Sequence, residues 1–209
     1  MLVKKFSLLY DGIDFNFIFK ESYMKKMKFY IVLISWIQVT LVCTASIQTL
    51  IWLYPILGQQ GVSVYRALQQ GVSGFTLVIC GMTIAVKLIK KHWLAVVIIT
   101  TILTLIADLV YLTASTPCIM CAVVVSLCAF QIYMTAKSGW VDEVYSGTDR
   151  TTLSNHQYAA SAIGGAIGCI LGGYIPASSI NCTVLFLIAD SVYAITDIWL
   201  IQMLQKLKK

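Results

Sequence analysis

Long apolar runs alternate with short polar segments along this chain. Each run holds about 20 mostly apolar residues, the length that an α-helix needs to cross the hydrocarbon core of a bilayer. The pattern predicts an all-α polytopic membrane protein with six transmembrane helices, at 29–54, 68–88, 93–114, 117–136, 155–176 and 181–204. The longest internal polar connection is too short for a separate domain, so we expect one membrane domain over 29–209.

Residues 1–28 precede the first predicted helix and mix aromatic side chains with lysines and acids. This composition suits an amphipathic arm on the inner membrane surface, and a flexible tail is an equally open alternative. The apolar run that follows is longer than the roughly 7–15 residues of a signal-peptide core, so we expect it to stay as an anchor.

The composition supports lipid as the main solvent. Of 209 residues, 59% are hydrophobic and 11% are charged, and the mean hydropathy is +0.84. If the first helix runs outward, the lysines and arginines fall on the inner side, with Arg66 alone outside. We therefore expect a multi-pass protein of the cell membrane with both termini cytoplasmic. The net charge of +6 then reflects topology, and no nucleic-acid partner is expected.

The segment "SAIGGAIGCILGGYIP", residues 161–176, places glycines where a soluble helix would lose stability. Gly164, Gly168 and Gly172 follow one another at intervals of four, so they form one stripe along a helix. A stripe without side chains lets a second helix approach closely. We predict that these three glycines, with Gly173, are helix-packing residues.

The same segment reads G-x-x-x-G-C-x-x-G-G and resembles the glycine motif of the major facilitator superfamily (MFS). This family also carries a turn with a glycine and basic residues between its second and third helices, and the segment "GMTIAVKLIKK" at 81–91 resembles it. Arg150 precedes the fifth predicted helix much as a family arginine does. The resemblance implies an MFS-like half bundle, most like the C-terminal half of the family. Simple helix packing is the alternative, since such small-residue patterns occur in many membrane proteins.

A function follows from this resemblance. It implies that the chain moves a small solute as a half or truncated secondary transporter, not as an enzyme, and without a cofactor or metal. Alternating access needs two bundles around a midplane site, so we expect a homodimer or a second six-helix chain as partner. The sequence has no Walker loop, HExxH or GxSxG motif.

Three carboxylates lie within the predicted helices. Charged residues at bilayer depth are costly and usually face a cavity or a partner. Asp190, Asp108 and Asp197 are therefore candidates for coupling solute movement to an ion by protonation, with interhelical hydrogen bonding as the alternative.

A polar stripe also marks the first predicted helix. Thr40, Thr44 and Gln48 follow one another at intervals of four, and Gln131 in the fourth helix is a further polar candidate. We expect these residues to line a substrate pathway, or else to make uncharged hydrogen bonds between helices.

Two other function classes stay open. Cys118 and Cys121 form a CxxC at the outer end of the fourth helix, where a helix N-terminus favours a thiolate. The segment is similar to the CxxC of the vitamin K epoxide reductase family, which implies a membrane thiol–quinone oxidoreductase. A non-transporting assembly or immunity protein is the other alternative.

Overall fold

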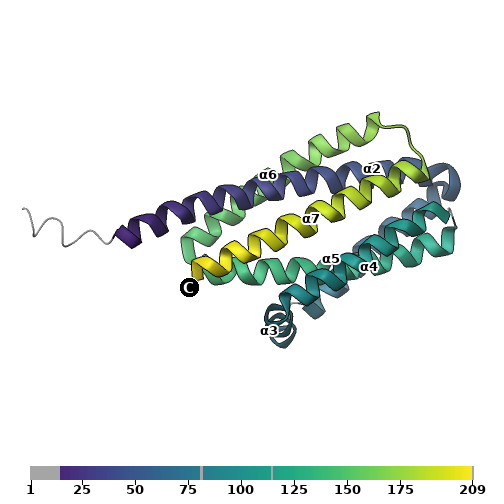
Figure 1. Cartoon of the computed structure of the whole chain (residues 1–209). Helices are drawn as coiled ribbons and strands as arrows, with labels where there is room; N and C mark the ends of the chain where they lie inside the picture. Colours follow the sequence, from purple (N-terminus) through teal and green to yellow (C-terminus); the bar gives the residue numbers. More distant parts are fainter. Residues whose placement is uncertain (1–14, 81, 114, 209) are drawn as a thin grey trace, which may run out of the picture.

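The computed structural model describes residues 15–80, 82–113 and 115–208, and within these ranges it is a bundle of helices (Figure 1). The long helices lie side by side along one axis, and α2 packs against α5, α6 and α7 while α4 packs against α5 and α7. In chain order the elements are α2 (Phe15–Cys80), α3 (Thr83–Lys91), α4 (Trp93–Val110), the 3-10 turn η1 (Tyr111–Thr113), α5 (Thr116–Val144), α6 (Gly147–Tyr174) and α7 (Ser179–Lys208).

The helix α2 bends back on itself at Gly58. This residue has φ 65° and ψ −179°, a conformation outside the helical region that favours glycine because it lacks a Cβ atom. Leu53 and Tyr65, on either side of the bend, belong to one buried cluster. After the bend, Oγ1 of Thr76 lies 3.4 Å from Sγ of Cys128 in α5. The segment 59–80 therefore returns along the bundle beside α5.

Four of the described helices are long and apolar enough to cross a membrane: α2, α4 with η1, α5 and α7. The predicted helices at 93–114, 117–136 and 181–204 correspond to α4 with η1, α5 and α7. The predicted helix at 68–88 is misplaced, because the returning part of α2 ends at Cys80 and residues 83–91 form the separate helix α3. Gly81, from the basic-turn resemblance, lies outside the described residues.

Two further predicted boundaries differ from the structure. The first described helix, α2, begins at Phe15, so residues 15–28 of the expected arm belong to this helix. Residues 1–14 lie outside the described part. The fifth predicted helix corresponds to α6, which begins earlier, at Gly147, with a polar first half. Unlike the other four, α6 is not among the described helices apolar enough to be counted as spans.

Ion pairs gather at one end of the bundle, which we call the charged end. Lys28 of α2 pairs with Asp149 of α6 at 2.6 Å, and Lys208 of α7 pairs with Glu143 of α5 at 2.5 Å. Lys90 of α3 also pairs with Glu143. The first described residues of α2 and the end of α7 both lie toward this end (Figure 1).

A buried tyrosine adds to the packing at the charged end. Burial and the nearby Asp149 raise the pKa of Tyr145 to about 12, so its hydroxyl keeps its proton. That hydroxyl donates to the main-chain oxygen of Met24 at 3.1 Å. The contact ties the end of α5 to the start of α2.

The outer surface of the bundle is apolar along much of its length. Phe75, Val78, Ile106 and Ile195 are each more than half exposed. Soluble proteins rarely expose so many large apolar side chains together. This surface suits contact with lipid.

Candidate functional site

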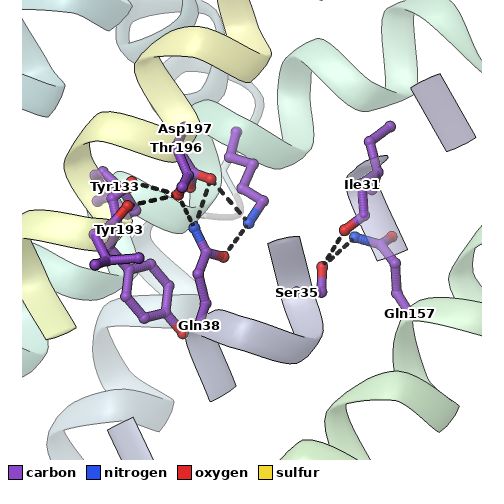
Figure 2. Close-up of polar contacts among 10 residues, drawn as sticks. Ile31, Ser35, Gln38, Tyr133, Gln157, Tyr193, Thr196 and Asp197 are labelled. Carbon is purple, nitrogen blue, oxygen red and sulfur yellow. Dashed lines mark hydrogen bonds and ion pairs between the residues drawn. The ribbon is translucent and has the colours of Figure 1, made fainter. Parts of the chain in front are cut away.

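The centre of the site is a buried ion pair between α5 and α7, with a glutamine from α2 bridging it. The Lys137 ammonium nitrogen Nζ lies 3.2 Å from Asp197 Oδ1 and donates to Gln38 Oε1 at 2.8 Å. The Gln38 amide Nε2 donates in turn to Asp197 Oδ1 and to Thr196 Oγ1, both at 2.8 Å. Figure 2 shows Gln38 reaching across to Asp197 and Thr196.

These three side chains have little contact with solvent. Lys137 is 4% exposed, Gln38 1% and Asp197 0%. A buried charge needs a partner of opposite sign and further hydrogen bonds to offset its desolvation. The cluster supplies both, and it joins the three helices in one arrangement.

Two tyrosines pack beside this cluster. The Tyr133 hydroxyl of α5 donates to the main-chain oxygen of Tyr193 of α7 at 2.5 Å (Figure 2). The two rings meet edge to face, with centroids 6.2 Å apart. These two contacts join α5 to α7.

A cavity of about 320 Å³ opens beside the ion pair, between α2, α5, α6 and α7. Its wall extends to Arg150, which pairs with Asp142 at the charged end. Gln157 of α6 donates through its Nε2 to Oγ of Ser35 in α2, at 3.1 Å (Figure 2). The described lining residues are Ser35, Gln38, Val39, Met134, Lys137, Ser138, Val141, Arg150, Ser154, Gln157, Tyr158, Ser161 and Tyr193.

A second, smaller cavity of about 140 Å³ holds two carboxylates, Asp108 of α4 and Asp190 of α7. The two carboxyl groups lie close enough to interact with each other. Asp108 is 2% exposed, and its Oδ2 has no hydrogen-bond partner in the described structure. No lysine, arginine or histidine is among the described residues that line this cavity.

Aromatic rings surround the two carboxylates. Tyr65 and Tyr111 meet through their hydroxyls at 3.4 Å, and Phe186 stacks on Tyr111 with ring centroids 5.4 Å apart. All three line the smaller cavity. Asp190 and Asp197, which the sequence places on roughly one face of a helix, therefore have different partners: one joins a second carboxylate and the other a lysine.

The polar stripe on α2 lies in the interface with α6. Thr40 and Thr44 donate within their own helix, to Trp36 and Thr40 main-chain oxygens at 2.8 Å. Gln48 donates to the main-chain oxygens of Gly172 and Ile175. These three candidates for a substrate pathway thus face the α6 backbone, as in the alternative of hydrogen bonding between helices.

The fourth candidate, Gln131, lies apart from them. It lines a separate groove beside the end of α2 and the charged-end half of α5. The structure therefore does not bring the four expected pathway residues together. The polar positions that meet around the larger cavity are instead Gln38, Lys137 and the polar face of α6.

The glycine stripe explains how α6 reaches α2 so closely. A Cβ atom at Gly164 would lie 2.7 Å from the Trp36 main-chain oxygen, and one at Gly172 would lie 2.7 Å from that of Thr44. A Cβ at Gly168 would collide with the Thr40 main-chain oxygen.

Gly173 differs from the other three glycines that we expected to pack. A Cβ at Gly173 would meet no described atom within 4 Å. The residue is exposed, and it takes no part in the close approach to α2.

The two cysteines of the CxxC lie on the first turns of α5, at the end of the bundle opposite the charged end. Both thiols are free and exposed. They line an apolar groove against α4, and no other cysteine is among the described residues of that groove. The arrangement therefore shows no second thiol pair beside them.

Sequence reasoning missed Lys137 because the fourth helix was expected to end at residue 136. In the structure α5 continues to Val144, so Lys137 belongs to the helix and turns inward. Lys137 follows Tyr133 by four residues, so a helix that continues past 136 would carry both side chains on one face. This spacing was the sequence signal that could have identified Lys137. Gln38 was missed because it lies outside the stripe of threonines on α2.

A comparison with protein-family models, curated proteins and solved structures found no match.

Proposed function

We propose that this chain is one half of a membrane carrier that moves a small solute by alternating access. The observation that carries the proposal is a set of ionisable groups beside cavities in an apolar bundle: the buried pair of Lys137 with Asp197, and the buried Asp108 with the half-buried Asp190. Ionisable residues at membrane depth are costly, and they typically mark solute or proton pathways. The MFS resemblance of the sequence supports the same function.

In this proposal the chain crosses the membrane six times. The bend at Gly58 divides α2 into two parts, and each exceeds the roughly 20 residues that a crossing needs. The 28 residues of α6 are also long enough, and close packing on α2 shields part of its backbone. With six crossings, the lysine-rich charged end faces the cytoplasm of the cell.

The two cavities have separate roles in this mechanism. The larger cavity lies next to a polar cluster and binds the solute. The smaller cavity binds a proton, because two carboxylates in one buried site repel each other when both are ionised and a shared proton removes that repulsion. Tyr65 and Tyr111 are the other titratable side chains among its described lining residues.

One bundle of this kind supplies half of an alternating-access device. The chain therefore works as a homodimer or beside a second six-helix chain. Rocking of the two bundles would open the solute cavity to each side of the membrane in turn.

The test is proton-coupled uptake into proteoliposomes that contain a trapped pH-sensitive dye. Amino acids, carboxylates, amines and sugars are added in turn under an imposed pH gradient. We expect at least one solute to move protons with the wild-type chain, and Asp190→Asn to remove the gradient dependence while solute exchange continues. Asp149→Asn is the matched control, because this exposed carboxylate lies at the charged end.

Two results would contradict the proposal. One is a gradient dependence that survives unchanged in Asp190→Asn. The other is a folded wild-type chain that moves none of these solutes, either alone or with a co-expressed six-helix partner.

A further inference from the structure

The larger cavity is lined by cations and hydrogen-bond donors, and its described lining contains no aspartate or glutamate. Lys137 lies at its inner wall and Arg150 toward the charged end. Their acidic partners, Asp197 and Asp142, are not among the described lining residues. The described lining of this cavity therefore carries two positive side chains and no negative one.

Both cations keep donors that are free for a ligand. An ammonium has three N–H donors and a guanidinium has five. Among described residues, Lys137 bonds to Gln38 and Asp197, and the Arg150 guanidinium bonds to Asp142 through Nε. One N–H of Lys137 and the terminal N–H groups of Arg150 remain available.

The polar face of α6 adds hydroxyl and amide groups to the same space. Arg150, Ser154 and Ser161 recur at the spacing that puts residues on one face of a helix, and all three line the cavity. Gln157, also in the lining, gives one amide hydrogen to Ser35. This face can orient a ligand whose charge is held by the two cations.

Apolar side chains complete the wall. Val39, Met134 and Val141 line the cavity beside the polar groups. A volume of about 320 Å³ is at the small end of ligand sites, which run from about 300 to 1,000 Å³. The space suits a small molecule that combines a charged group with an apolar body better than it suits a bare inorganic ion.

We propose that this cavity binds a small organic monocarboxylate, with the carboxylate between Lys137 and Arg150 and the apolar body against Val39, Met134 and Val141. The inference deepens the proposed carrier function and rests on it, because it assigns the class of solute. Planar guanidinium groups bind carboxylates, like phosphates, through two parallel hydrogen bonds. The apolar wall favours an organic anion over inorganic phosphate.

The experiment measures binding to the purified full chain in detergent, near neutral pH, by equilibrium dialysis of labelled benzoate. Benzamide and benzylamine are the neutral and cationic probes of the same shape. We expect saturable binding of benzoate, competition by hexanoate, and no comparable binding of the other two. Chloride and inorganic phosphate should compete weakly at the same concentration, because neither fills the apolar part of the cavity.

Variants locate the site. Arg150→Gln should weaken benzoate binding about tenfold, since a charge-assisted pair is lost. The paired change Lys137→Gln with Asp197→Asn should weaken it similarly while leaving no unpaired buried charge. Lys91→Gln is the matched control, since this exposed lysine lies on α3 away from the cavity, and it should bind as the wild type does.

Several outcomes would overturn the assignment: equal binding of benzamide, unchanged binding in folded Arg150→Gln, or competition by phosphate as strong as by hexanoate. Binding in detergent needs no gradient, so the two proposals can fail separately. Benzoate binding without any proton-coupled uptake would refute the carrier and retain the site. Uptake of amines or sugars without benzoate binding would refute the site and retain the carrier.

Discussion

Asp197 is the most deeply buried carboxylate among the described residues, and its ion pair with Lys137 is completed by the bridging amide of Gln38. At the scale of single residues, such a cluster is stable when its two charges are either both present or both absent. Loss of one partner leaves an uncompensated charge in a medium that solvates it poorly, whereas loss of both charges leaves groups that can still share hydrogen bonds.

We predict that Asp197→Asn alone lowers the free energy of unfolding by about 3–5 kcal/mol, because Lys137 is left buried without its counter-charge. Adding Lys137→Gln should recover most of this loss. The measurement is the melting temperature of the purified chain in detergent. Asp149→Asn, in an exposed ion pair, should change stability by about 0–1 kcal/mol. A melting temperature for Asp197→Asn equal to that of the wild type would show that the pair does not hold the helices together.

At the scale of elements, the contact between α2 and α6 depends on complementary surfaces. The glycines of α6 leave room for the α2 backbone. On the facing side, Thr40 and Thr44 donate to carbonyls of their own helix, so their hydroxyls need no partner from α6. Close packing of these two surfaces is therefore one part of the contact. The hydrogen bonds from Gln48 to the α6 main chain and from Gln157 to Ser35 are the other part.

A single methyl group should test this contact. We predict that Gly168→Ala destabilises the fold by about 1–3 kcal/mol, the usual cost of overpacking, because the new Cβ would collide with the Thr40 main-chain oxygen. Gly173→Ala is the matched control on the same helix and has open space around it. It should be neutral or slightly stabilising, since alanine favours a helix over glycine by up to about 1 kcal/mol. The readout is the folded fraction by size-exclusion chromatography in detergent, and equal fractions for both variants would refute the close approach.

At the scale of the whole molecule, the two ends of the bundle differ in charge. The ion pairs of Lys28, Lys90, Arg150 and Lys208 gather at the charged end. Arg66 follows the bend at Gly58, and the connection between α6 and α7 lies at the same opposite end (Figure 1). This asymmetry is what the positive-inside rule expects of a membrane protein with the charged end in the cytoplasm.

The orientation can be measured with single cysteines in a cysteine-free background. Ala177 lies in the connection between α6 and α7, and Ser146 lies between α5 and α6 at the charged end; both are exposed. We predict that an impermeant maleimide labels Ala177→Cys in intact cells, and Ser146→Cys only after the membrane is opened. The reverse pattern would invert the proposed topology, and labelling of both in intact cells would mean that the bundle does not span the membrane.

Several features of this protein follow from the sequence alone. Apolar runs predicted the helices at 93–114, 117–136 and 181–204, because a helix in lipid must present apolar side chains over its length. The glycines and the threonines recur at a spacing of four, and helix periodicity places such residues on one face of their own helix. The distribution of lysines and arginines likewise anticipated one basic end. The predicted boundaries were less accurate where a helix contains a charged residue, as α5 does at Lys137. A charged residue after an apolar run is assigned to a loop unless its buried partner is known.

Only the tertiary structure decided which of these surfaces meet. It paired Asp197 with Lys137 and placed Asp190 beside Asp108, although both aspartates lie seven residues apart on α7. It turned the stripe of Thr40 and Thr44 toward glycines instead of a cavity. The physical reason is that periodicity defines the face of a helix but not its neighbour. Neighbours depend on the bend at Gly58 and on how side-chain volumes fit between helices that are distant in sequence.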